Sequence, residues 1–177
     1  MRRALFYPTA EGEARLLLLI AAFSINGSSL EGRTKLAKLD FFIRYPPFFA
    51  RALSSRRTLT QRARDAIENA LAEGRTIESR MIRYRYGPWD PAHFALLGRL
   101  VGKGLVEPVS ETNGVGYRVT DRGAKLAGEL AGTEAWATVA ERAALLKAHL
   151  DLTGYGLQQF IYKNFPEVVG TSWGETL

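Results

Sequence analysis

The chain of 177 residues contains no cysteine, which excludes disulfides, thiolate metal sites and a cysteine nucleophile. An apolar content of 46% is enough for the core of one domain, or of two small domains packed together. The longest apolar run, residues 14–23, is about half the length that a bilayer-spanning helix needs, and the acidic Glu11 and Glu13 precede it. We therefore expect a soluble, cytoplasmic protein.

The net charge of +6 is unevenly distributed along the chain. Residues 1–85 contain 16 Lys and Arg against 8 Asp and Glu, a net charge of +8, whereas residues 86–177 contain 8 against 10, a net charge of −2. Most of the excess is arginine. This asymmetry indicates either contact with a nucleic acid or an acidic protein, or a solvated surface of Arg–Glu pairs.

Two helices are predicted before the first proline pair. Residues 11–25 are apolar nearly all round, which is typical of a central helix. Residues 33–44 place apolar side chains on one face and basic side chains on the flanks; the apolar set is Leu36, Leu39, Phe42 and Ile43, and the basic set is Arg33, Lys35 and Lys38. Tyr45-Pro46-Pro47 then ends the helix.

Residues 46–78 read as an insertion. Residues 48–53 predict one or two helical turns. Residues 56–74 contain good helix formers but a weak apolar stripe and many charges, so either an exposed helix or a mobile segment fits the pattern.

Residues 80–86 alternate in the manner of a half-buried strand, with Ile82, Tyr84 and Tyr86 on one side. Gly87-Pro88 is expected to stop this strand. Asp90-Pro91 then opens a helix over residues 91–103, with Asp90 as N-cap and Gly104 as its C-terminal stop. The helical spacing predicts that its inward residues are Phe94, Leu97, Leu100 and Val101.

A hairpin follows this helix. Residues 105–110 and 115–120 are rich in β-formers and are joined by a polar loop that contains Asn113-Gly114. Thr120 is placed to cap a helix over residues 121–131. Helix, two-stranded wing and helix form the second half of a winged helix-turn-helix.

Further helices are predicted over residues 134–150 and 154–164, and the remainder of the chain carries little signal for regular structure. The expected fold is mainly α (α+β), a winged helix-turn-helix with a β-hairpin wing and a C-terminal helical extension. The expected division is a winged-helix core over residues 1–132, with its insertion around 46–78, and an extension over residues 133–177 that serves docking or dimerisation.

No catalytic, metal or cofactor motif is found. The two histidines, His93 and His149, fall on different predicted helices without metal-ligand or His–carboxylate spacing, and both are expected at the surface. The glycines form neither a phosphate loop nor a dinucleotide fingerprint. We expect a non-enzyme without a cofactor.

Binding is the remaining class of function. Phosphate contacts are assigned to basic side chains on the helices, the strand and the wing: Arg33, Lys35, Lys38, Arg83, Arg85, Arg99, Lys103, Arg118 and Arg122. The helix after Asp90 offers few groups that read base edges, so sequence-specific recognition is poorly supported. Contacts to a partner are assigned to the C-terminal extension, at Trp136, Val139, Leu146, Leu150 and Phe160.

Three segments together resemble a known family: RTKLAKLDFFIRYP, YRYGPWDP, and GLVEP followed by GYRVTDRG. This combination is similar to the middle component of bacterial ABC-three-component systems, the Lamassu-like antiphage defence family. The resemblance covers about residues 11–130.

The resemblance implies a small non-catalytic subunit that sits on an SMC/Rad50-like ABC ATPase. Such a subunit helps to restrain an effector, often a nuclease, until foreign DNA is sensed. It implies no catalytic residue in this chain. The rival hypothesis is a winged-helix transcription regulator that dimerises through residues 134–165 and binds double-stranded DNA through residues 91–103 and the wing.

Overall fold

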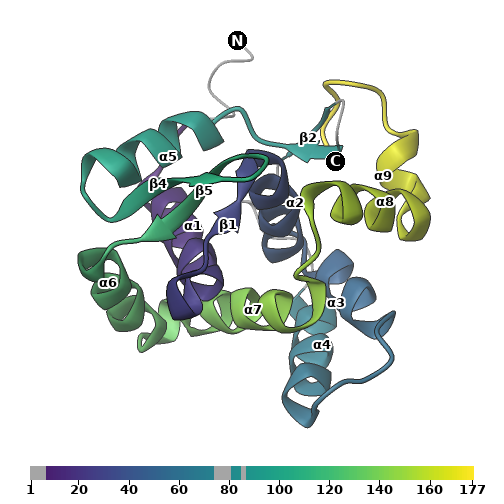
Figure 1. The fold of residues 1–177 in the computed structure, drawn as a ribbon. Helices are drawn as coiled ribbons and strands as arrows, with labels where there is room; N and C mark the ends of the chain where they lie inside the picture. The colour runs from purple at the N-terminus through teal and green to yellow at the C-terminus, as the bar shows by residue number, and fades with distance from the viewer. Residues whose placement is uncertain (1–6, 74–80, 85–86) are drawn as a thin grey trace.

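The computed structural model describes residues 7–73, 81–84 and 87–177, and within these ranges the chain is mainly helical with two small antiparallel sheets (Figure 1). The predicted mainly α (α+β) composition is confirmed. No helix in these ranges is long and apolar enough to cross a membrane. The helices are α1 (Ala10–Phe23), the 3₁₀ turn η2 (Ile25–Gly27), α2 (Gly32–Arg44), α3 (Pro46–Ser54), α4 (Gln61–Glu73), α5 (His93–Gly102), α6 (Asp121–Ala131), α7 (Glu134–Leu150), α8 (Gly154–Asn164) and α9 (Pro166–Gly170). The strands are β1 (Leu30–Glu31), β2 (Ile82–Tyr84), β3 (Gly87–Trp89), β4 (Val106–Glu111) and β5 (Gly114–Val119).

Helices α1 and α2 lie at the centre of the structure (Figure 1). Thr9 begins α1, because its Oγ1 accepts a hydrogen bond from Gly12 N at 3.0 Å. Helix α1 contacts α5, α6 and α7, and α2 contacts α3, α7 and α8. Every residue of α2 from 35 to 44 is buried. The predicted polar flank at Lys35 and Lys38 is therefore wrong, because α8 and β3 cover those sides of the helix.

The first sheet contains the predicted hairpin. Strand β5 pairs with β4 on one side and with β1 on the other, which gives the order β1-β5-β4. Val106 lies opposite Val119 and Glu111 opposite Gly114. The turn between the strands ends at Gly114, whose φ of 127° favours glycine. Strand β1 thus ties the segment between α1 and α2 to the hairpin.

Helix α6 follows β5 directly, and its first turn lies against the backbone of Leu105. Thr120 caps α6, as predicted, by accepting a hydrogen bond from Gly123 N at 3.0 Å, and Thr120 N donates to Leu105 O at 3.1 Å. A Cβ atom at Gly123 would lie 1.9 Å from Leu105 O. Glycine at this position allows α6 to approach the start of β4.

Helices α3 and α4 occupy most of the predicted insertion. Pro46 stands in the first turn of α3, where a missing N–H costs no helical hydrogen bond. Of the two structures that the sequence allowed for residues 56–74, an exposed helix or a mobile segment, residues 61–73 adopt the helix. Helix α4 packs against α3 and α7 through small side chains, which explains its weak apolar stripe; the buried ones are Ala63, Ala66 and Ala70. Residues 74–78 of the insertion lie outside the described residues.

The second sheet differs from the prediction. Residues 82–84 form a strand, as expected, but Gly87 and Pro88 belong to the opposite strand instead of ending the first. Residues 174–177 run along the other edge of β2: Arg83 N donates to Glu175 O at 2.9 Å, and Leu177 N donates to Met81 O at 2.8 Å. The C-terminal segment therefore has a regular backbone position that its sequence does not reveal.

Helices α7 and α8 have the predicted limits. Helix α7 packs against α1, and α8 packs against α2. Phe160 and Phe165 lie in an aromatic cluster with Phe42 and Phe48, with ring centroids 5.4 to 6.4 Å apart. The helices at both ends of the chain thus contribute to one hydrophobic core.

The contact at Gly123 yields a stability prediction. We expect Gly123→Ala to lower the free energy of unfolding by about 2 kcal/mol or more, because the added Cβ meets a backbone carbonyl that cannot move independently of β4. Chemical denaturation followed by circular dichroism measures this change. Gly128→Ala in the same helix is the control: its Cβ meets open space, so it should be neutral or stabilise by up to about 1 kcal/mol. Equal effects of the two variants would contradict the proposed packing constraint.

Candidate functional site

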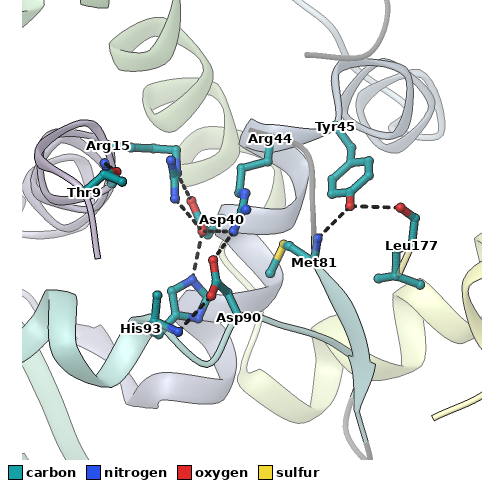
Figure 2. Close-up of polar contacts among 11 residues, drawn as sticks. Thr9, Arg15, Asp40, Arg44, Tyr45, Met81, Asp90, His93 and Leu177 are labelled. Carbon is teal, nitrogen blue, oxygen red and sulfur yellow. Dashed lines mark hydrogen bonds and ion pairs between the residues drawn. The ribbon is translucent and has the colours of Figure 1, made fainter. Parts of the chain in front are cut away.

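A buried ionic cluster fixes the position of α5, the helix between β3 and the β4–β5 hairpin. Its members come from α1, α2, the turn after β3 and the start of α5, as Figure 2 shows. All five side chains are buried: Arg15, Asp40, Arg44, Asp90 and His93. The charges of two arginines and two aspartates balance within this group.

Asp40 is the centre of the cluster. Its Oδ1 lies 2.6 Å from Arg15 Nε, and its Oδ2 lies 2.9 Å from His93 Nε2. Arg44 Nη1 lies 2.6 Å from Asp90 Oδ2 and 3.7 Å from Asp40 Oδ2. Asp40 therefore connects the central helices to α5 directly, and Arg44 connects them through Asp90 (Figure 2).

Electrostatic contacts keep Asp40 ionised. Burial alone raises the pKa of this carboxyl, but the charge of Arg15, the hydrogen bond with His93 and the charge of Arg44 together hold the pKa well below its usual range. Such a shift is common in active sites and also in structural ion networks. Within the described ranges, no three His, Asp or Glu side chains are grouped so that they could hold a metal ion.

His93 is buried, so its predicted surface position is wrong. Because an ionised carboxylate can only accept, Nε2 donates the hydrogen bond to Asp40. Nδ1 is buried without a hydrogen-bond partner. Asp90 orients the same turn, since its Oδ1 accepts from Ala92 N at 2.8 Å and its carbonyl accepts from His93 N at 3.0 Å. The prediction that Asp90 is the N-cap of this helix is wrong, because α5 begins at His93 and its N-cap residue is Ala92.

Several predicted phosphate-binding cations are neutralised within the chain. Arg99 and Lys103 both pair with Glu13 of α1, Arg99 Nη1 at 3.4 Å from Glu13 Oε1. Arg118 pairs with Glu107 across the hairpin at 2.8 Å. These residues remain partly exposed, but each already has an acidic partner. Arg122 is exposed, and its Nη1 donates to the carbonyl of Lys103 at 3.2 Å.

The basic residues of α2 have three different environments. Arg33 is exposed and its guanidinium carbon lies 4.4 Å from the centre of the Phe94 ring. Lys35 is buried and pairs with Asp151 at 2.7 Å. Lys38 is buried beneath the β2–β3 sheet, so neither Lys35 nor Lys38 lies at the outer surface, where the phosphates of a DNA backbone would have to contact it. Arg83 is half-buried on β2, and Arg85 lies outside the described residues.

The predicted partner contacts on the C-terminal helices mostly face inward. Leu146 and Leu150 are fully buried, because α7 turns this stripe towards the core. Trp136 and Val139 are half-buried and pack on the core, and Phe160 lies in the aromatic cluster with Phe42 and Phe165. Two of the five side chains therefore have no exposed surface to offer a partner.

The outward face of α5 is apolar. Phe94 is 53% exposed and Val101 is 37% exposed, which reverses their predicted inward positions. The predicted inward positions of Leu97 and Leu100 are confirmed, and Leu96 faces the core with them. Between the two exposed side chains lie the small exposed residues Ala95 and Gly98, and Gly102 follows Val101. Because α5 is apolar on nearly every side, its sequence period does not reveal which face is covered.

The ionic cluster yields a prediction on stability and pH. We expect Asp40→Asn to lower the free energy of unfolding by about 3 to 5 kcal/mol at pH 7, since Arg15 and Arg44 then keep buried charges without full compensation. Asp65→Asn, on the exposed side of α4, is the control and should change stability by less than about 0.5 kcal/mol.

The difference in the free energy of unfolding between Asp40→Asn and the wild type should become smaller as the pH falls. Because the pKa of Asp40 is lowered in the folded state, its contribution is complete above about pH 5 and is lost progressively as the pH falls below the unfolded value near 4. Denaturation curves measured at several pH values should therefore show that the free energies of unfolding of the variant and the wild type converge as the pH falls. A constant difference across this range would show that Asp40 does not act through its charge.

Comparison of the chain with protein-family models, curated proteins and solved structures gives no match.

Proposed function

We propose that this protein is a non-catalytic winged-helix accessory subunit of an ABC/SMC-like ATPase antiphage defence complex. In this role it bridges or restrains the ATPase and a nuclease-type effector, with at most backbone contacts to DNA. The apolar outward face of α5 is the observation that carries the proposal. The sequence resemblance supplies the identity of the complex.

The order of elements supports the winged-helix part of the proposal. Helix α1, strand β1, helix α2, helix α5 and the β4–β5 hairpin follow one another, with α3, α4 and the β2–β3 sheet inserted between α2 and α5. The sheet order β1-β5-β4 places the first strand beside the second strand of the wing. This is the arrangement expected when a wing folds back on a helix-turn-helix core.

The surface of α5 favours a protein partner over base recognition. Base edges in the major groove are read by side chains such as Arg, Asn and Gln, whereas the exposed positions of this helix are mainly apolar or small. Phe94 is supported from behind by Trp89, with ring centroids 5.6 Å apart, so it is held in place. An exposed, supported aromatic side chain is typical of an anchor at a protein interface.

The pairing of the cations supports the same reading. Arg99 and Lys103 are the basic side chains of α5 and its C-terminus, and both are engaged by Glu13. A DNA phosphate would have to compete with this carboxylate. We therefore expect weak DNA binding that has no sequence preference and falls steeply with salt.

The alternative is a dimeric winged-helix transcription regulator. It is favoured by the cations without a carboxylate partner among the described residues, of which Arg33 and Arg122 are exposed. The net charge of +8 on residues 1–85 also fits this role. The two functions differ in their principal partner, protein or DNA.

Affinity purification from the native host at moderate salt tests the proposal. The tagged wild type should retain a large ATPase in stoichiometric amounts, with or without an effector. Phe94→Asp places a charge in the centre of the outward face of α5 and should reduce recovery of the ATPase at least about tenfold. Leu71→Asp on α4, at a similarly exposed apolar side chain, is the matched control and should retain it.

Recovery of the wild type alone or as a homodimer would contradict the adaptor function. Selection of bound duplexes from genomic DNA then tests the alternative. A preferred site that Arg99→Ala or Lys103→Ala relaxes would identify a regulator.

A further inference from the structure

A cavity of about 360 Å³ lies between α2, the β2–β3 sheet and the start of α5. This volume is in the range of sites for small organic ligands. The polar side chains that line it, among the described residues, all come from α2 and are Arg33, Thr34 and Lys38. The remaining walls are apolar or aromatic and include Ala37, Ile82, Pro88, Trp89, Pro91 and Phe94.

Lys38 is the unusual residue of this cavity. Its side chain is 1% exposed, and its Nζ has one hydrogen bond, to the carbonyl of Thr34 at a long 3.4 Å. No carboxylate of the described residues lies within ion-pair distance of Nζ, whereas the neighbouring buried Lys35 is paired with Asp151. Lysines are almost never fully buried unless they are paired. Among the described residues, this buried ammonium thus has no counterion.

The surroundings hold Lys38 in this position. Gly87, with a φ of 110°, brings the β3 backbone over the side chain, and a Cβ at Gly87 would lie 3.8 Å from Lys38 Cε. Burial lowers the pKa of Lys38 to about 8, so the amine is still mainly protonated at neutral pH. An anion that reached Nζ from the cavity would therefore meet a positive charge that has lost its hydration.

We propose that this cavity binds a small organic acid, with its carboxylate on Lys38 Nζ and a flat apolar body against Trp89 and Phe94. A carboxylate fits better than a phosphate, because the described lining supplies a single buried cation and few other donors. The Thr34 side chain and the Arg33 guanidinium, both from α2, are the further polar groups at the site. The inference stands without the proposed adaptor function, because it concerns the isolated chain.

Calorimetric titration of the purified protein with 1-naphthoate tests this proposal, with 1-naphthamide as the neutral probe of the same shape. At pH 7 the naphthoate should bind with saturation, and the amide at least about tenfold more weakly, as expected for the loss of a charge-assisted hydrogen bond. The affinity for naphthoate should fall as the pH rises above about 8, where Lys38 loses its proton.

Lys38→Met tests the assignment of the residue. Methionine keeps the apolar length of the buried side chain, so the variant should fold, and its binding of naphthoate should be reduced to that of the amide. Lys125→Met on the exposed side of α6 is the matched control and should bind as the wild type does. Equal affinities of the two probes for the wild type would overturn the proposal even if Lys38→Met failed to fold. Unchanged naphthoate binding by a folded Lys38→Met would also overturn it.

Discussion

Four buried charges compensate one another, on Arg15, Asp40, Arg44 and Asp90. Their pairing depends on the relative positions of α1, α2 and the turn before α5. The free-energy cost of an unpaired buried charge is several kcal/mol, which is comparable with the whole stability of a small domain. A shift of α1 against α2, or of the turn before α5, would separate these charges. The cluster therefore acts as a constraint on the relative positions of the central helices and α5.

This constraint determines which surface α5 presents. His93 at the first position of the helix is held against Asp40, and this fixes the rotation of the helix about its axis. Leu96, Leu97 and Leu100 are then directed into the core, and Phe94 and Val101 are directed outward. The proposed docking surface is thus a consequence of a hydrogen bond on the opposite side of the same helix.

Helix α2 contributes residues both to the ionic cluster and to the cavity. On one side it supplies Asp40 and Arg44 to the ionic cluster, and on another it supplies Lys38 to the cavity beneath the β2–β3 sheet. The C-terminal segment stabilises that sheet: Tyr45 Oη accepts from Met81 N at 2.9 Å and donates to Leu177 O at 3.1 Å (Figure 2). Asp40 and Lys38 are both buried, but within the described part of the chain only Asp40 has partners of opposite charge. This difference distinguishes the structural cluster from the candidate binding site.

The sequence alone is sufficient to predict those elements whose signals are local. Helices α7 and α8 have the predicted limits, and the hairpin and the Thr120 cap follow from β-propensity, turn chemistry and N-cap geometry. It did not determine which sides of α2 and α5 are covered. Helix α5 is apolar on nearly every side, and the basic flank of α2 is covered by β3 and α8, which lie far from it in the chain. Contacts between distant segments also determine the position of residues 174–177 and the burial of His93 and Lys38. The pairing of Gly87 and Pro88 with β2 was missed because this dipeptide usually ends a strand. These features become visible only in the folded chain, because burial and charge compensation depend on the neighbours that folding brings together.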